Sequence, residues 1–335
     1  MSFTGTTYGD ISPRVGLFAV AKMLATAKNQ LVLERTAMVQ AVPKNRGLLV
    51  KFRRPIKFAA STTPLTEGVT PAPNILAYED VSCVLQQYGS WVPFTDVIMD
   101  THEDPNLSVI SEQCGEQAAL IKERVMWGIL RGGTNVNYTG GVSARADVDV
   151  PLDLDDIRAA VRNLKNNHAM KITKVLKAST SIATQPVNAS YIAYAHTNLE
   201  ADFRDMTSFI PVQNYSSGAG SAINEFELGS VEEVRIILTN HLEPFYGAGS
   251  IDIAGVLNNG TNVDVYPVVI IGQDAYGVTP LAGGAVQMSV LNPKMGRDSV
   301  DPLGQRGHVA WKMWFAAVRL NEQWMIRLET AATAL

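Results

Sequence analysis

The side chains that could carry out catalytic or metal chemistry are scattered along this sequence. Its two cysteines, Cys83 and Cys114, form neither a disulfide framework nor a metal-binding pattern. None of the histidines has a carboxylate or a second histidine at the spacing that places two ligands on one helix face. The histidines are His102, His168, His196, His241 and His308. We therefore predict no catalytic residue, no cofactor, no structural metal and no enzymatic activity.

Three further groups of residues have structural explanations. The loop Tyr215–Ala222 contains Gly-Ala-Gly but lacks the lysine and the following helix of a phosphate-binding loop. Asp153, Asp155 and Asp156 fall at the start of a predicted helix, where the helix dipole stabilises negative charge. Four aromatic residues near the C-terminal end could form a stacking platform, but we favour core packing. They are Trp311, Trp314, Phe315 and Trp324.

Composition excludes several functional classes. The chain has 335 residues, a formal net charge of −4 and only 18% charged residues. This balance argues against a general nucleic-acid binder and against a membrane-surface protein. No apolar run approaches the roughly 20 residues that span a bilayer, and the first residues lack a secretory pattern. Free thiols fit a reducing compartment, so we expect a soluble protein made in the cytosol.

One long helix is predicted between Asp104 and Gly133. Asp104 can cap its start, Pro105 suits the first turn, and Gly132-Gly133 ends it. Its apolar stripe is formed by Leu107, Ile110, Cys114, Ala118, Ile121, Val125 and Ile129. Such a helix would be on the order of 40 Å long. An elongated shell subunit could need this rod, and an ordinary long amphipathic helix is the alternative.

A two-stranded excursion is predicted before this helix. The strand-like run Leu48–Phe58 is basic, the segment after it is rich in proline, and strands resume at Ile75–Tyr88 and Ser90–Ile98 with acidic residues. An isolated two-stranded ribbon is marginal in water, so it normally lies on another surface. A hairpin packed on its own domain is the alternative.

The remaining segments mix helices and strands without a regular β-α-β order. Helices are expected at Val15–Leu31, after Asp153 and at Asn198–Met206, and strands at Lys171–Ala178, Ser190–Ala195, Val234–Thr239, Val265–Ile271, Val309–Leu320 and Trp324–Leu328. We expect an exposed loop at Glu243–Asn262 and a turn region at Gly272–Gly284. The fold class is therefore α+β.

Several segments together resemble the phage major capsid proteins of the HK97-like fold, most closely the N4-type family. They are LTEGVTP at Leu65–Pro71, RVMWG at Arg124–Gly128, VDVYP at Val263–Pro267 before IGQDAYG at Ile271–Gly277, and DPLGQRGHVAWK at Asp301–Lys312 with Leu320–Glu322. The last segment is the most specific, and the similarity covers about residues 40 to 330. The chain departs from the pattern at His196-Thr197, where many such proteins have His-Pro.

The resemblance implies a division of the chain. Residues 1–40 are similar to the N-terminal arm, 41–90 to the E-loop, and 151–284 to the A-domain. Residues 91–150 and 285–335 would form the P-domain, with its spine helix at 105–131. The implied function is a structural shell subunit that assembles through hexamers and pentamers into the icosahedral head of a tailed phage. The implied partners are other copies of the chain, packaged double-stranded DNA bound without sequence specificity, and scaffold, portal and decoration proteins. The implied location is the virion, after assembly in the host cytoplasm.

We expect the excursion to make its main contacts with a neighbouring subunit. Arg53 and Arg54 are successive in a strand, so their side chains face opposite sides and cannot share one internal partner. Acidic residues near the start of the spine helix of the next subunit are candidate partners. The full set of candidate contact residues is Lys51, Arg53, Arg54, Lys57, Glu67, Glu103, Asp104, Glu112 and Glu116.

Two other functions fit the sequence. A nanocompartment shell protein of the same fold, similar to the encapsulins, would enclose enzymes instead of a genome. A cytosolic α+β enzyme could use the loop Tyr215–Ala222 for a phosphorylated ligand and would be a small oligomer.

Overall fold

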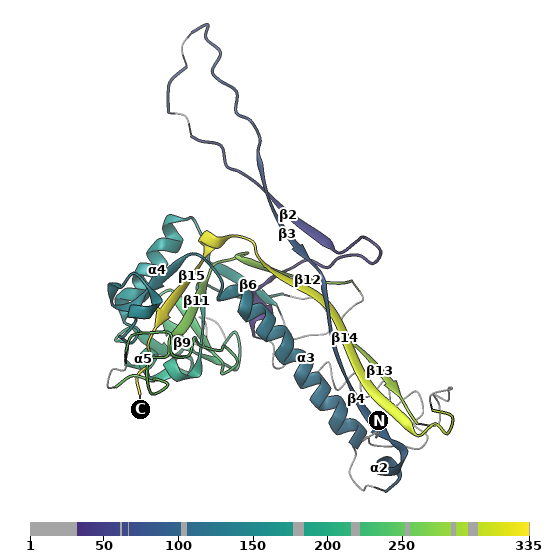
Figure 1. Ribbon diagram of the computed structural model, residues 1–335. Coiled ribbons are helices and arrows are strands. Elements are labelled where there is room, and N and C mark those ends of the chain that lie inside the picture. Colours follow the sequence, from purple (N-terminus) through teal and green to yellow (C-terminus); the bar gives the residue numbers. More distant parts are fainter. Residues whose placement is uncertain are drawn as a thin grey trace.

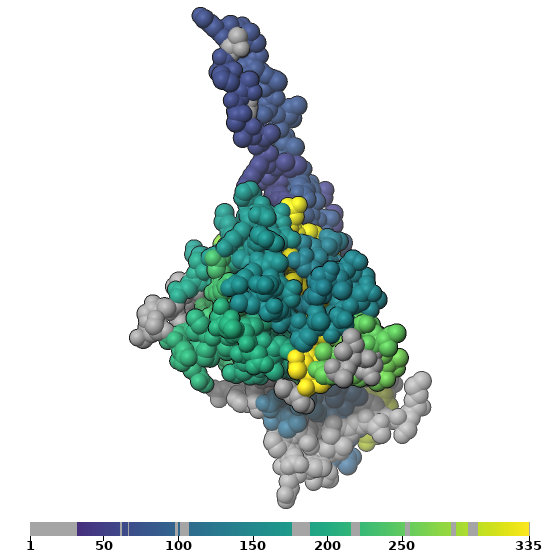
Figure 2. Space-filling model, turned by 90° about the vertical axis from the view of Figure 1, so that its left-hand side faces the viewer, coloured from purple at the N-terminus to yellow at the C-terminus, as the bar shows by residue number. Residues whose placement is uncertain are grey.

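The computed structural model describes residues 32–60, 62–65, 67–101, 106–176, 184–215, 222–251, 255–282, 286–293 and 301–334. It has three parts: a rounded lobe, an elongated body with one long helix, and a narrow ribbon that projects from the body (Figure 1). The space-filling view shows the ribbon standing clear of the lobe (Figure 2). The predicted α+β class is confirmed by this arrangement of helices and sheets.

The long helix α3, Asn106–Leu130, lies within the predicted range 105–131. Its apolar stripe packs against the strand β14, Arg306–Arg319, and buries Cys114, Ala118 and Trp127. Gly132 and Gly133 follow its end as predicted, whereas Asp104 and Pro105 lie outside the described residues.

A five-stranded sheet forms the body beside this helix. The 14-residue strand β14 pairs with β4, Gln86–Thr95, along one edge. Its other edge pairs with β13, Gln287–Leu291, and β12, Tyr276–Pro280, and β12 also pairs with β1, Met38–Val39. The short helix α2, Asp96–Thr101, follows β4 where we expected a strand to continue.

The expectation of a turn region at Gly272–Gly284 is wrong. Its centre forms β12, which is buried between β1 and β14. Glycine and proline suggested a turn, but Gly277 and Pro280 sit within the strand, and the sheet partners on both sides supply the apolar environment. Tertiary pairing thus overrides the local turn signal.

The lobe is built on an eight-stranded sheet. Its main order is β5-β15-β11-β7-β10-β9-β8, and β6 pairs with β7 beside this path. The strands are β5 Val136–Tyr138, β6 Ile172–Leu176, β7 Thr184–Ala195, β8 Phe209–Pro211, β9 Glu227–Val231, β10 Val234–Leu238, β11 Tyr266–Ile271 and β15 Met325–Thr330. The strand β11 is buried along its whole length, as its β-branched run predicted.

Two helices complete the lobe: α4, Leu154–Asn166, and α5, Glu200–Asp205. Asp153 caps α4, and Asp156 returns a bond to the backbone of Asp153, which confirms the structural explanation of these carboxylates. In the part of the chain that the structure describes, six short 3-10 turns connect other elements. They are η1 Leu33–Thr36, η2 Thr139–Gly141, η3 Arg145–Asp147, η4 Thr197–Leu199, η5 Val212–Asn214 and η6 Glu322–Trp324.

The last two strands are consecutive in the chain but belong to different sheets. β14 runs through the body, η6 turns the chain, and β15 enters the lobe between β5 and β11. Trp311 and Phe315 are buried, and Trp314 and Trp324 pack half-buried against core clusters, so the aromatic residues are core residues as favoured. The predicted domain boundary at residue 284 falls between β12 and β13, inside the five-stranded sheet.

The segment Glu243–Asn262 is more ordered than the exposed loop that we expected. Phe245 forms a bridge with Val265, and Asn258 bridges to Val263, which is fully buried. Apolar side chains among the glycine and asparagine residues hold this segment against the lobe. The helix expected at Val15–Leu31 and residues 216–221 of the glycine-rich loop lie outside the described residues.

The ribbon consists of β2, Leu49–Pro55, and β3, Tyr78–Val84, which pair antiparallel with each other. Within the described residues, neither strand pairs with any other strand. Residues 56–77 form the tip between them, and Leu85, which is buried, joins β3 to β4. No helix in the described ranges is long and apolar enough to cross a membrane.

Two glycines provide a test of this packing. A Cβ at Gly229 in β9 would meet the backbone carbonyl of Ile210 and the ring of Phe209, whereas a Cβ at Gly128 in α3 would meet nothing. We expect Gly229→Ala to lower the free energy of unfolding by about 1–3 kcal/mol through overpacking. Gly128→Ala should leave it equal or raise it by up to about 1 kcal/mol, because alanine favours the helix. Denaturant unfolding of purified subunits would measure both, and equal effects of the two changes would contradict the described packing.

Candidate inter-subunit surface

The ribbon exposes apolar surface that nothing in the described chain covers. Its tip carries Leu65, Val69 and Ile75, with exposures of 76%, 62% and 83%. Further exposed apolar side chains on the tip are Ile56, Phe58 and Leu76. Gly68, with φ of 76°, makes the turn that reverses the chain there. Single exposed apolar residues are ordinary, but six on one projection are typical of an interaction site.

The two faces of the ribbon differ. Val50 and Cys83 lie half-buried on one face, where they pack on a small cluster that includes Leu85 and Ala316 at the base of the ribbon. The opposite face exposes Leu49 and other apolar side chains, among them Tyr78 and Val84. One face therefore attaches the ribbon to its own subunit, and the other stays open.

Both arginines of the ribbon have partners within it. The guanidinium of Arg53 forms two hydrogen bonds with Asp80, of 2.8 and 3.1 Å. Arg54 donates to Glu79 at 2.6 and 2.9 Å. Each acid lies directly opposite its arginine in the strand register, and the hydrogen bond from Arg53 lowers the pKa of Asp80.

The side chains thus face opposite sides, as predicted, but each has its own internal acid. Cross-strand pairs of this kind favour the observed strand register, and water screens them because both partners are exposed. Because both arginines are already paired, their expected role at a neighbouring subunit remains a prediction.

The other expected contact residues lie in two separate places. Lys51, Lys57 and Glu67 are exposed on the ribbon. Glu112 and Glu116 are half-buried, one turn apart, in the first half of α3. Glu103 and Asp104 lie outside the described residues. The ribbon and the start of α3 are at opposite ends of the body (Figure 1), so one chain does not bring these charges together.

The contact residues expected from the sequence are all charged, and the apolar residues of the tip are not among them. Those residues were visible between Pro55 and Tyr78, but isolated apolar residues among prolines predict no regular element. Their exposure depends on the ribbon leaving the body, which local sequence does not show.

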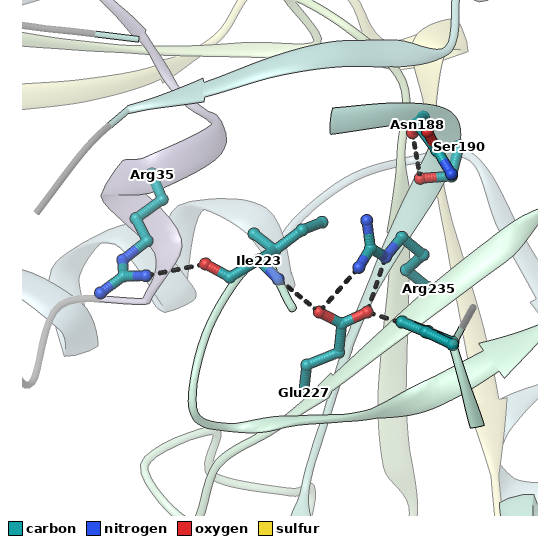
Figure 3. A network of polar contacts seen from close by, with 7 residues as sticks. Arg35, Asn188, Ser190, Ile223, Glu227 and Arg235 are labelled. Carbon is teal, nitrogen blue, oxygen red and sulfur yellow. Dashed lines mark hydrogen bonds and ion pairs between the residues drawn. The ribbon is translucent and has the colours of Figure 1, made fainter. Parts of the chain in front are cut away.

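A buried polar network joins η1 to the lobe (Figure 3). Arg35 donates to the carbonyl of Ile223 at 2.9 Å, and the amide of Ile223 donates to Glu227 at 2.6 Å. Glu227 also pairs with Arg235 at 2.6 Å and accepts a hydrogen bond from Tyr215 at 3.0 Å. Glu227 therefore holds residues on both sides of positions 216–221, where the sequence suggested a phosphate loop.

A second buried cluster centres on Glu329 in β15. Its carboxylate accepts hydrogen bonds from Arg145 at 2.6 and 2.8 Å and forms an ion pair with Arg327. The hydrogen bond raises the pKa of Arg145, whose guanidinium lies 3.6 Å from the centre of the Phe245 ring. Arg327 also donates to the carbonyl of Arg131, just beyond α3. The cluster ties the end of the long helix to the lobe.

These charged groups form structural contacts. Across the described ranges, no three residues among histidine, cysteine, aspartate and glutamate are grouped to hold a metal ion. A groove of about 390 Å³ lies between α4 and the turn after β9, and its Arg158 and Lys165 are paired with Glu232 and Glu233. The buried charged clusters connect the helix, the turn η1 and the lobe. The apolar tip of the ribbon is a surface that is open to a partner.

Comparison with known proteins places this fold among viral shells. The family model described as phage capsid protein matches residues 78–328. The capsid of Ralstonia phage GP4 has a TM-score of 0.66 and 12% identity, covering 91% of this chain and 94% of that one. The capsid of Cyanophage P-SCSP1u has a TM-score of 0.59 and 14% identity, covering 99% and 90%. The head of Helicobacter pylori bacteriophage KHP40 has a TM-score of 0.59 and 13% identity, covering 90% and 88%. No curated protein sequence matches the chain significantly.

Fold and family together define a structural protein of a viral shell. Because the family model matches well over half of its length, the chain belongs to the phage capsid protein family. It is a structural capsid protein of a bacteriophage, which self-associates into the shell of the virion. The predicted HK97-like fold and the predicted capsid function are confirmed, while the finer assignment to the N4-type family stays a prediction.

The buried Glu329 cluster gives a stability prediction. Glu329→Gln should lower the free energy of unfolding by about 3–5 kcal/mol, because it leaves two guanidinium groups without their buried carboxylate. The matched control is Glu200→Gln, which breaks the exposed pair with Arg204 and should cost no more than about 1 kcal/mol. Denaturant unfolding compares the two, and a small effect at Glu329 would mean that this cluster is solvated.

A charge swap separates the two possible roles of Arg53. The double change Arg53→Asp with Asp80→Arg keeps the pair inside the ribbon but exchanges the charges that a neighbour would meet. If Arg53 contacts another subunit, both the single change Arg53→Asp and the swap should reduce the particle yield in sedimentation, with unchanged circular dichroism. Wild-type yield from the swap, with a defect only in the single variant, would assign Arg53 to its own ribbon alone.

Proposed function

We propose that the ribbon is the main inter-subunit arm of this shell protein, and that its tip docks on a neighbouring copy. The supporting observation is the set of exposed apolar side chains at Leu65, Val69, Ile75 and around them. Burying one such side chain contributes roughly 1.5–3 kcal/mol, far more than an exposed ion pair. The charged residues of the ribbon then orient the contact and exclude wrong registers.

In this proposal the parts of the chain have distinct tasks. Residues 1–40 act as the N-terminal arm, 41–90 as the E-loop, and the body with its spine helix as the P-domain. The lobe acts as the A-domain, near the centre of a hexamer or pentamer. Proline residues in the tip support this role, since they reduce the freedom that docking removes.

We further propose that the closed icosahedral shell holds the double-stranded DNA of a tailed phage without sequence preference. The net charge of −4 supports this view, because a confined genome needs counterions and not a strongly basic protein surface. Scaffold, portal and decoration proteins are proposed partners, and the host cytoplasm is the proposed place of assembly. A structural subunit of this kind needs no catalysis.

Substitutions in the tip test the proposed arm. We expect Leu65→Ser with Ile75→Ser to leave the melting temperature of the subunit unchanged, because both side chains are exposed. The same variant should reduce the yield of closed particles at least tenfold in sedimentation and negative-stain microscopy. The matched control is Met170→Ser, an exposed apolar side chain on the lobe. Normal particles from the tip variant would overturn the docking proposal, and nuclease-sensitive DNA in wild-type particles grown in the host would contradict genome enclosure.

A further inference from the structure

The long helix α3 carries a buried carboxyl group, that of Glu123, at the place where residues 32–36 pack against the helix. Glu123 of α3 is only 1% exposed. One of its oxygens, Oε1, accepts the backbone N–H of Leu33 at 3.2 Å. The other, Oε2, has no hydrogen-bond partner among the described residues. Carboxyl groups are seldom buried with an unpaired oxygen, because the ionised form loses its hydration without compensation.

The segment that Glu123 holds is the turn η1 and the residue before it. The carbonyls of Leu33 and Val32 accept hydrogen bonds from the hydroxyls of Tyr276 and Tyr194. The hydroxyl of Thr36 lies 2.7 Å from each of these two tyrosine hydroxyls. Glu123 thus binds the turn from the helix side, and the tyrosines of β7 and β12 bind it from the two sheets.

The charged groups around Glu123 do not neutralise it. Lys122, its neighbour on α3, pairs with Glu34 at 2.5 Å, and Arg35 of the same turn points to the carbonyl of Ile223. Burial raises the pKa of Glu123 to about 8. The amides of Leu33 and Val32 and the charge of Lys122 act against this rise, and the charge of Glu34 adds to it. Burial also raises the pKa of both tyrosines, which stay neutral. At neutral pH the carboxyl therefore holds a proton.

We propose that Glu123 is a proton-controlled latch, whose neutral carboxyl holds residues 32–36 against α3 and whose ionisation releases this segment. When the latch opens, the proton passes to solvent and the carboxylate becomes hydrated. The opening would also remove Arg35 from Ile223 and Thr36 from the two tyrosines, so it would loosen the connection between the helix and the lobe. The latch belongs to the single subunit and does not depend on the proposed docking of the ribbon.

The direction of the pH dependence follows from proton linkage. The latched state binds its proton up to about pH 8, whereas a released glutamate loses it near the ordinary value of 4.5. The latch is therefore strongest below pH 4.5 and weakens as pH rises through this window. One proton is involved, so the equilibrium constant for closing the latch should fall about tenfold for each pH unit between pH 4.5 and 8. Above pH 8 it should become constant.

Hydrogen exchange of the full-length subunit tests the latch. The amides of Leu33, Arg35 and Ala37 are hydrogen-bonded in or beside the turn, so a peptide covering residues 32–37 reports its opening. After correction for the intrinsic exchange rate, its protection should fall about tenfold for each pH unit between pH 6 and 8 and then level off. Glu123→Gln, which keeps an oxygen for the Leu33 amide, should remove this dependence. Glu34→Gln removes a negative charge that raises the pKa of Glu123, so the protection should become constant at a lower pH than in the wild type.

The peptide Tyr266–Ile271 from β11 is the reference for global unfolding, because this strand is buried along its whole length and lies between β15 and β7 inside the sheet. Protection of residues 32–37 that does not vary with pH would overturn the proposal, as would an unchanged slope in Glu123→Gln. Equal protection of β11 and of residues 32–37 at every pH would also overturn it, since the turn would then open only when the whole fold unfolds and not as a local latch. If Glu123→Gln fails to fold, the wild-type series and Glu34→Gln still decide.

Discussion

The packing of α3 on β14 is the interaction on which the rest of this subunit depends. Along its length the helix buries Cys114, Ala118 and Trp127 in one core cluster, together with Trp311 and Phe315 of the strand. The same cluster includes Ile192 and Val269 from the sheet of the lobe, so a single apolar core joins body and lobe. The ribbon and the lobe both extend from this rigid centre. A shell protein needs a rigid centre, because a change in the shape of the subunit would be repeated in every copy of the shell.

Polar groups complete this core at its ends. Glu329 gathers two arginines where α3 ends, and Glu227 gathers Arg235, Tyr215 and the Ile223 amide beside η1. Buried ion pairs contribute little net stability, but they fix geometry, because any other arrangement leaves a charge unpaired. Here they set the position of the lobe against the helix. Glu123 differs from them, since its hydrogen-bond donor is a backbone amide and not a cation, and burial raises its pKa to about 8.

The ribbon, in contrast to this core, exposes apolar side chains to water. It has one attached face at its base, an open face, and a tip whose apolar residues stay in water in the isolated chain. A free subunit with such a surface would gain by association, and the chain belongs to a phage capsid protein family. The internal pairs of Arg53 and Arg54 keep the ribbon extended, so that its apolar tip is presented away from its own core.

The sequence by itself determined the elements that carry strong local signals. The periodic stripe of α3, the start of a helix at Asp153 and the β-branched run of β11 were all predictable, and specific segments such as Asp301–Lys312 indicated the capsid family. Only the tertiary structure decided that Gly272–Gly284 holds a strand, that β14 and β15 enter different sheets, and that Asp80 and Glu79 neutralise the arginines. It alone placed Glu123 beneath Leu33, 90 residues away in the chain. Periodicity and capping depend on neighbours within a few residues, whereas sheet pairing, burial and charge partners depend on segments that meet only when the chain has folded.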